Sequence, residues 1–340
     1  MFKIFEGKLI IFSFFIAIFG LFVFSLAAQA QVTDVVSSTI ATTTTEEATS
    51  SPWDEAPAVV EPTIRVGIYK TDKKVLFMSP YSYEVISNEQ SLGLVEEGKL
   101  VTLSYDNGVY SIVTDSFSTT SIYFIRLISH DADSYFSIMN LDRHLIGRSQ
   151  LNFATFRGDL EYRYAPKSEI PYVINELLLE NYVAGIAETS NGAPDEYIKA
   201  LQIAARTYAY MNIGPAPSEK RMFDVYASTV DQLYLGYNFE QFSPRIALFT
   251  AATRGQMVTY RDKPVTTYYY SRSNGKTKTK PGVPWLKSVA CKYDKGWRQL
   301  GHGYGMSNRD AAARARIDKW KYEKILNYYY SGTKVQKLYE

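Results

Sequence analysis

The sequence predicts an α+β fold in two regions, a β-rich region over residues 64–152 and a mixed α/β region over residues 153–340. Apolar residues make up 46% of the 340-residue chain and charged residues 21%, a balance typical of a globular protein with a core. In the first region apolar and polar residues alternate, whereas in the second several apolar residues recur at helical spacing. The two patterns favour strands first, then helices mixed with strands.

The first 30 residues have the pattern of an export segment. Lys3 and Lys8 precede an apolar run over residues 9–27, and Ala28-Gln29-Ala30 matches the small-x-small pattern of a cleavage site. The run is also about 20 residues long, which is enough to span a bilayer. Residues 1–30 are therefore interpreted as a signal peptide or a membrane anchor. Either one places the protein outside the cytoplasm, secreted or anchored at the cell envelope, with membrane contact through this segment alone.

A spacer is predicted over residues 31–63, which are rich in Ser, Thr, Ala, Glu and Pro and include four consecutive threonines at 42–45. Such a composition buries too little apolar surface to offset the entropy lost on ordering. We therefore expect a disordered linker that lets a tethered domain reach away from the membrane.

Residues 64–152 are predicted to form a β-rich accessory domain. In residues 64–68, Ile, Val and Ile alternate with Arg and Gly, and similar β-rich runs occupy residues 100–105, 109–113 and 122–127. The turn sequence Asp106-Asn107-Gly108 separates two of these runs and predicts a hairpin. No catalytic constellation is found in this region.

Helical signals appear in the second region. Residues 174–186 carry apolar side chains at helical spacing, and a polar loop follows from Glu188 to Ala193. Pro194 then stands where a helix would start, with acidic residues in its first turn. The apolar face of this second helix contains Ile198, Leu201, Ala205 and Tyr208. Glu188 is thus expected in the connection between two helices, where its side chain can face a cleft.

The C-terminal part combines strands, a helix and a basic charge. Strand-like runs at Met257–Tyr260 and Val265–Tyr270 precede a final helix near Lys319–Tyr329. Residues 261–340 contain 18 Lys and Arg against 6 Asp and Glu, a net charge of +12 in a chain of net charge +2. This asymmetry predicts a basic surface for an anionic polymer or a membrane surface. Because an exported protein rarely meets nucleic acid, no nucleic-acid partner is expected.

The content of cysteine and histidine argues against a metal centre. Cys291 is the single cysteine, so an intramolecular disulfide or a cysteine-based zinc site within one chain is excluded. The three histidines, His130, His144 and His302, are too widely spaced to suggest a metal motif. The sequence therefore predicts neither a metal nor another cofactor.

Six motifs in one order resemble the SpoIID/LytB family, the group of stage II sporulation protein D and the amidase enhancer. The resemblance extends over about residues 156–334, with a weaker similarity at 64–68, and the glycine-flanked histidine motif is the most distinctive part. The motifs are Glu188 followed by Pro194 and AARTYA at 204–209, DQLYLG at 231–236, TRGQ at 253–256, YSRSNGKT at 270–277, GHGYGMS at 301–307 and YYYSGT at 328–333. Leu201, Asn274 and Asn308 depart from the residues that are usual in the family.

The resemblance implies a SpoIID-like mixed α/β catalytic domain over residues 153–340. Its activity would be that of a peptidoglycan lytic transglycosylase, which cleaves glycan strands, including strands free of stem peptides, to 1,6-anhydro-muramoyl ends. Glu188 is assigned the role of general acid/base, since a carboxyl group in a desolvated cleft can stay protonated and donate to the leaving oxygen. By position alone, a solvated loop residue or a helix cap is the ordinary role of such a glutamate, and the motif match is what favours the catalytic role.

Two other functions stay open. The family name also covers a non-catalytic enhancer, which binds peptidoglycan and stimulates an N-acetylmuramoyl amidase as its partner. A purely structural envelope protein would use the basic C-terminal stretch for adhesion alone. The glycan strands of peptidoglycan are the expected partner in each case.

The motifs also supply candidate substrate-binding residues, each with a structural alternative. Arg206 can orient Glu188 or bind sugar hydroxyls, or it can form a structural salt bridge. Serine hydroxyls can bind the glycan or face solvent, and glycines allow close approach of the backbone to a ligand. Gln232 and Tyr234 can line the groove or pack in the core. The full set of candidates is Arg206, Gln232, Tyr234, Ser271, Ser273, His302, Gly303 and Gly305.

Overall fold

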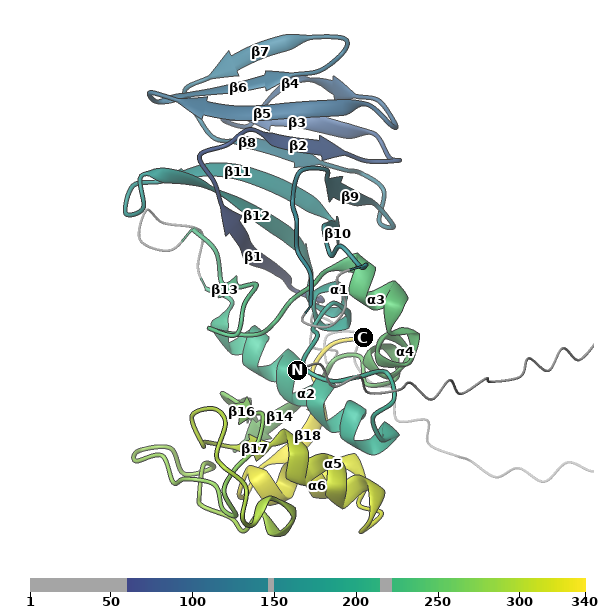
Figure 1. The fold of residues 1–340 in the computed structure, drawn as a ribbon, viewed down its shortest axis with the longest axis vertical. Helices are drawn as coiled ribbons and strands as arrows, with labels where there is room; N and C mark the ends of the chain where they lie inside the picture. Colours follow the sequence, from purple (N-terminus) through teal and green to yellow (C-terminus); the bar gives the residue numbers. More distant parts are fainter. Residues whose placement is uncertain (1–59, 146–149, 215–221) are drawn as a thin grey trace, which may run out of the picture. The chain divides into compact units, whose positions relative to one another are not determined.

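Strands and helices both contribute to the part of the chain that the computed structural model describes, residues 60–145, 150–214 and 222–340 (Figure 1). The fold class is α+β with a β-rich N-terminal region, as predicted. The predicted export segment at 1–30 and the linker up to residue 59 lie outside the described residues. No helix in the three described ranges is both long enough and apolar enough to cross a membrane.

Two large sheets form the N-terminal region. A seven-stranded sheet has the order β13-β1-β12-β11-β8-β3-β4, and a six-stranded sheet has the order β10-β9-β2-β5-β6-β7. Neighbouring strands are antiparallel except for the parallel pair of β1 and β13. The strands are β1 (Thr63–Lys70), β2 (Val75–Met78), β3 (Tyr83–Ser87), β4 (Gln90–Val95), β5 (Leu100–Asp106), β6 (Val109–Val113), β7 (Ser118–Ser121), β8 (Ile125–Ile128), β9 (Tyr135–Ile138), β10 (Thr155–Arg157), β11 (Asp159–Ala165), β12 (Ile170–Leu178) and β13 (Val225–Tyr226).

The predicted hairpin joins β5 to β6. Asp106 pairs with Val109 across the turn, and the two central residues, Asn107 and Gly108, have φ angles of 46° and 89°. Positive φ at both central positions is the geometry of a two-residue turn that matches the twist of the strands, and Asn-Gly adopts it readily. The hairpin prediction is confirmed.

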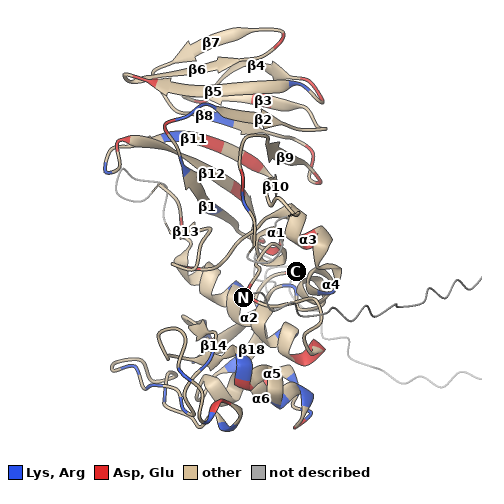
Figure 2. Cartoon of the chain, viewed as in Figure 1, with Lys and Arg blue, Asp and Glu red and all other residues tan. Residues whose placement is uncertain are grey.

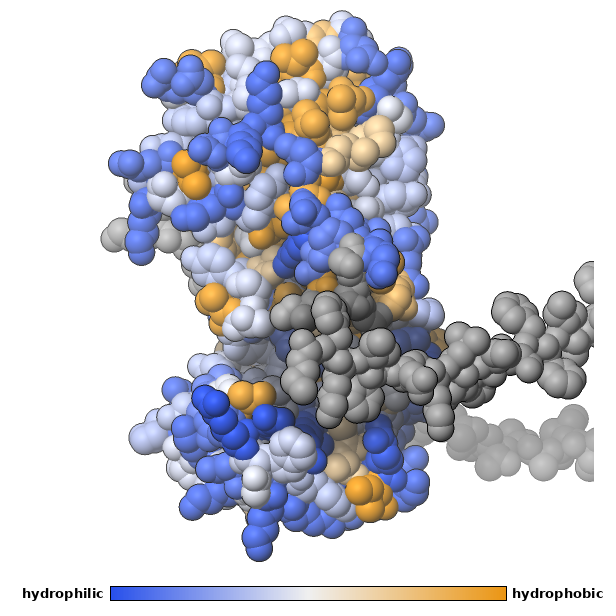
Figure 3. Space-filling model, viewed as in Figure 1, coloured by the Kyte–Doolittle hydropathy of each residue, from blue (hydrophilic) through white to orange (hydrophobic). Residues whose placement is uncertain are grey.

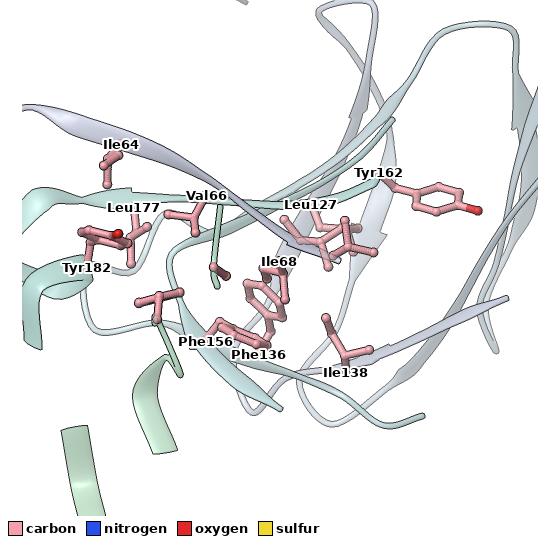
Figure 4. Packing of buried hydrophobic residues seen from close by; sticks show 14 of the residues in the cluster. Ile64, Val66, Ile68, Leu127, Phe136, Ile138, Phe156, Tyr162, Leu177 and Tyr182 are labelled. Atoms are coloured by element: carbon pink, nitrogen blue, oxygen red, sulfur yellow. The ribbon is translucent and has the colours of Figure 1, made fainter. Parts of the chain in front are cut away.

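The inner faces of the two sheets share one core. Figure 4 shows Val66 of β1 and Leu127 of β8 packed with Phe136 and Ile138 of β9, and all four side chains are fully buried. The same cluster continues to Tyr182 on the first helix. Each fully buried side chain of this kind stabilises the fold by roughly 1.5–3 kcal/mol, so the sheets and the first helix are held by a common apolar layer.

The sheets extend beyond both ends of the region predicted for them. Strands β10 to β12 come from residues after 152, so the expected domain boundary at 152/153 crosses the sheets rather than preceding a new layer. At the other end, Glu61 and Pro62 of the predicted linker belong to the folded part of the chain. The Glu180 N–H donates to Glu61 Oε1 at 2.7 Å, and the Leu179 N–H donates to the Pro62 carbonyl at 3.0 Å. Residues 64–152 thus do not form the sheets alone.

The predicted helix at 174–186 is wrong in its first half. Residues 170–178 form strand β12, and only the following six residues are helical, in α1 (Leu179–Ala184). Strand β12 lies between β1 and β11, where its backbone is paired on both sides. Periodicity alone cannot distinguish a short, mainly apolar strand in the middle of a sheet from a segment of buried helix.

Helix α2 (Asp195–Asn212) begins where the sequence predicted, directly after Pro194. Asp195 and Glu196 lie in its first turn, where negative charge is favourable. The helix packs against α1, α4, α5, α6 and β14, so it is the central element of the second region.

The remaining elements surround α2. The predicted strand at 257–260 and the final helix are confirmed, whereas in the run 265–270 only the last two residues are a strand. The elements are α3 (Tyr237–Phe242), α4 (Pro244–Ala252), β14 (Gln256–Tyr260), β15 (Lys263–Pro264), β16 (Tyr269–Tyr270), the 3-10 helix Lys292–Asp294, β17 (Met306–Ser307), α5 (Asn308–Arg316), α6 (Tyr322–Tyr329) and β18 (Lys334–Lys337).

The surface contains both apolar and polar side chains. Apolar side chains on the strands and turns of the sheets remain exposed, among them Leu94 and Ile122, which are 57% and 70% exposed. On the face drawn in Figure 3, the C-terminal region is mainly hydrophilic.

Candidate active site

A cavity of about 320 Å³ is lined by residues from five sequence segments that are far apart in the chain. Glu188 comes from the loop between α1 and α2, and Gln232 from the segment before α3. Ser271 follows β16, and His302 belongs to the glycine-rich loop before β17. The cavity is lined by Glu188, Tyr208, Thr229, Val230, Asp231, Gln232, Tyr268, Tyr269, Tyr270, Ser271, Leu300, Gly301 and His302. The fold thus brings together four of the predicted site residues.

The backbone holds Glu188 against the segment 233–235. Ile186 and Tyr234 form an antiparallel bridge, and the Ala187 N–H donates to the Leu233 carbonyl at 2.7 Å. The Leu233 N–H then donates to Glu188 Oε1 at 2.8 Å. Both the loop and one carboxylate oxygen are therefore held by main-chain hydrogen bonds.

The environment of Glu188 favours the protonated acid. Desolvation by burial raises the pKa of this carboxyl above 4.5, and the hydrogen bond from the Leu233 N–H opposes the shift only in part. Glu188 Oε2 accepts no hydrogen bond from any described residue. One oxygen is thus anchored while the other is available to a ligand in the cavity, as a proton donor requires.

This raised pKa predicts a pH-dependent penalty on stability. The folded protein binds the Glu188 proton more tightly than the unfolded chain, so the free energy of unfolding falls as the pH rises from 4.5 through the raised pKa. The slope for one proton is at most about 1.4 kcal/mol per pH unit. Glu188→Gln removes the titration, so its stability relative to wild type should increase over this range. Urea unfolding of both proteins at several pH values measures the difference in their free energies of unfolding. A difference that does not change with pH would contradict the prediction.

His302 is held in one orientation at the cavity. Its Nδ1 accepts the Tyr304 N–H at 3.0 Å, and its ring lies 5.4 Å from that of Tyr270 and 5.6 Å from that of Tyr268. Partial desolvation lowers the pKa of the imidazole, a hydrogen bond to the Tyr269 backbone opposes the shift, and Lys278 and Lys280 lower the pKa further. His302 is therefore a neutral polar contact at neutral pH.

The glycines beside His302 have a packing role. Gly305 has a φ of 70°, and a Cβ there would lie 1.9 Å from the Tyr268 carbonyl oxygen. At Gly303 a Cβ would lie 2.9 Å from Lys278 Cδ. Neither glycine lines the cavity, so the close approach that the sequence predicted is made to the chain itself.

Gln232 and Ser271 line the cavity in different ways. Gln232 is fully buried; its Nε2 donates to the Tyr269 hydroxyl at 2.7 Å and its Oε1 accepts the Tyr182 hydroxyl at 3.0 Å. Ser271 is exposed, so its hydroxyl is accessible to a ligand. Gln232 consequently positions Tyr269 in the wall, whereas Ser271 offers a free polar group.

Three predicted site residues lie elsewhere. Arg206 is completely buried and donates from Nε and Nη2 to the two oxygens of Glu180, at 2.8 and 2.6 Å, which is the salt-bridge alternative. The buried Tyr234 donates its hydroxyl to Asn175 at 2.9 Å, and the buried Ser273 donates to Asp294 at 2.9 Å. None of the three lines the cavity, and each belongs to the packed interior.

The predicted site residues do not include most of the tyrosines that line the cavity, nor its second carboxylate. Tyr208 and Tyr268 line the cavity, and so does Asp231, whose Oδ1 accepts the Tyr208 hydroxyl at 2.7 Å. The Tyr226 N–H donates to the other oxygen of Asp231 at 2.9 Å. Two signals were present in the motifs, where Tyr208 belongs to AARTYA at 204–209 and Asp231 opens DQLYLG at 231–236. Across the described ranges, no group of three or more His, Cys, Asp or Glu side chains could hold a metal ion.

Part of the chain is similar to a known protein family. Residues 168–260 match the family model SpoIID, stage II sporulation protein, a segment that contains Glu188 and Gln232 and ends before Ser271. Stage II sporulation protein D of Bacillus subtilis (strain 168) is 29% identical over 152 residues, 39% of this chain and 43% of that protein. The same-named protein of Bacillus amyloliquefaciens is 29% identical over 140 residues, 36% of this chain and 41% of that protein.

A third relative is an uncharacterised protein of Brachyspira hyodysenteriae (strain ATCC 49526 / WA1). It is 34% identical over 146 residues, 41% of this chain and 38% of the relative. The chain thus spans about two fifths of the length of these curated relatives.

Proposed function

Since this chain belongs to the SpoIID family, we propose that it is a peptidoglycan lytic transglycosylase with Glu188 as its general acid and base. The observation that carries the proposal is the setting of the Glu188 carboxyl. It lies in a ligand-sized cavity, one oxygen is fixed by the Leu233 N–H, the other is open, and burial raises its pKa.

The chemistry needs a group that first gives and then takes a proton. Protonated Glu188 donates to the glycosidic oxygen, and the bond from that oxygen to the anomeric carbon breaks. The C6 hydroxyl of the same muramoyl sugar then attacks the anomeric carbon, and the Glu188 carboxylate takes the hydroxyl proton. A 1,6-anhydro end forms, no water is consumed, and the acid is regenerated. A second catalytic carboxylate is not required, unlike in the usual paired-acid glycosidases.

The rest of the cavity suits a sugar. Its volume of about 320 Å³ lies in the range of roughly 300–1,000 Å³ that is typical of ligand sites. Tyr208, Tyr268 and the ring of His302 supply flat faces for the apolar faces of a sugar ring, and Ser271 supplies a hydroxyl. In the proposal, the substrate is the glycan strand of peptidoglycan and the protein acts outside the cytoplasm, tethered or released through its N-terminal segment.

Product analysis tests the reaction. Purified glycan strands are incubated with the full chain and with Glu188→Gln, and the new ends are identified by mass spectrometry. Anhydro-muramoyl ends made by wild type alone support the proposal, whereas ends that have gained water indicate a hydrolase. If both proteins leave the strands intact and stimulate an N-acetylmuramoyl amidase equally, the chain is a non-catalytic enhancer.

A further inference from the structure

Two lysines stand beside the cavity on the segment that pairs with the glycine-rich loop. Lys278 and Tyr304 form a parallel bridge, and the Lys278 N–H donates to the Gly303 carbonyl at 2.7 Å. Lys280 follows two residues later, on the same segment. Figure 2 shows that many Lys and Arg residues lie in this C-terminal region, which has a net charge of +12 over residues 261–340. Lys278 and Lys280 are singled out because their side chains contact residues of the cavity wall, His302 and Tyr268.

The side chain of Lys278 is held against the His302 loop. Its Nζ donates to the His302 carbonyl at 3.2 Å, and its Cδ would lie 2.9 Å from a Cβ at position 303. The absence of a side chain at Gly303 therefore makes room for the lysine. This contact places an ammonium group next to a residue that lines the cavity.

Lys280 is held by aromatic rings. Its Nζ lies 5.0 Å from the centre of the Tyr304 ring and 5.5 Å from that of Tyr268, which lines the cavity. A cation within about 6 Å of a ring face is attracted to it. Lys280 is partly buried, and the two ring contacts place its ammonium group beside the wall of the cavity.

Neither lysine is neutralised. Over the described residues, no carboxylate forms an ion pair with Lys278 or Lys280. The acidic groups of this region pair elsewhere: Asp318 with Lys292, and Asp294 with Arg309. Both lysines also lower the pKa of His302, so their positive potential reaches the wall of the cavity. The site thus has the carboxyl groups of Glu188 and Asp231 in its wall and two lysines without an ion pair at its rim.

We propose that Lys278 and Lys280 form a subsite for a carboxylate carried by the glycan, beside the sugar whose bond Glu188 cleaves. The inference rests on the proposed function and adds the group that these lysines recognise. Muramoyl sugars carry a lactyl ether whose carboxylate is free when no peptide is attached and is neutralised as an amide when a peptide is attached. Stem peptides carry carboxylates of their own, farther from the ring. The shared chemistry is a carboxylate that pairs with ammonium groups.

Binding without cleavage tests the subsite. The full chain carrying Glu188→Gln is titrated with fluorescently labelled glycan strands, and affinity is measured by anisotropy at constant salt. Three ligands are compared: strands with free lactyl carboxylates, the same strands after chemical amidation, and strands with intact stem peptides. The double substitution Lys278→Gln/Lys280→Gln is then added. The matched control is Lys287→Gln, an exposed lysine of the same region whose described contact is with Thr277, which does not line the cavity.

We expect amidation to weaken binding about tenfold, as for the loss of one charge-assisted contact. The double substitution should remove this difference, and Lys287→Gln should keep it. If the preference instead favours peptide-bearing strands and disappears in the double variant, the subsite takes a peptide carboxylate. A preference that survives the double substitution, or equal binding of all three ligands by the parent, overturns the subsite alone. Failure to bind any strand overturns the proposed function as well.

Discussion

Replacing Glu188 by Gln should lower the rate of glycan cleavage by about 10²- to 10⁴-fold, the usual contribution of a general acid. The amide keeps the size of the side chain and can still accept the Leu233 N–H, but it has no acidic proton for the leaving oxygen. Binding of the strand should change little, because the loss concerns the transition state. The measurement is the initial rate of release of new anhydro ends at saturating strand concentration.

The control is Glu323→Gln, which removes an exposed carboxylate from α6 in the same region. It should leave the rate within about twofold of wild type, because surface substitutions away from special features have small effects. Equal rates for wild type and Glu188→Gln would exclude Glu188 as the acid. The enhancer function would then be the stronger candidate.

Replacing Arg206 by Met should lower the free energy of unfolding by about 3–5 kcal/mol, since it leaves a buried carboxylate without its counter-charge. Arg206 is 0% exposed and binds both oxygens of Glu180, and it also donates to the carbonyls of Gln256 and Thr250, at 3.2 and 3.1 Å. Glu180 further accepts the Tyr339 hydroxyl at 2.7 Å, so the pair connects α1, α2 and the C-terminal residues. Urea unfolding measures the change.

Two further variants serve as controls for this result. Lys99→Met breaks an ion pair at 3.4 Å in which both side chains are well exposed, and it should cost less than about 1 kcal/mol. Combining Arg206→Met with Glu180→Gln neutralises the stranded carboxylate, so the double variant should be more stable than the sum of the single effects implies. An Arg206→Met cost no larger than that of Lys99→Met would show that the buried pair is not important for stability.

Local features were predictable where a short stretch of sequence determines its own geometry. Asn107-Gly108 encodes a turn that needs positive φ at two residues, and Pro194 with its acidic successors encodes the start of α2. Both signals act within one turn of chain, so neighbouring elements did not change the outcome. The position of Glu188 between α1 and α2 followed from the same kind of signal, although part of the preceding predicted helix is the strand β12.

The tertiary structure alone decided which motif residues face the cavity. Arg206, Ser273 and Tyr234 occur in the same motifs as cavity residues, yet each is buried with an interior partner, because burial depends on the elements packed around a side chain and not on its spacing in the chain. The cavity itself combines the loop of Glu188 with residues up to 114 positions later, at His302. The sequence by itself therefore determined the hairpin turn, the start of α2 and the place of Glu188 in the connection between two helices. Packing between distant segments determined the walls of the site, its desolvation and the lysines at its rim.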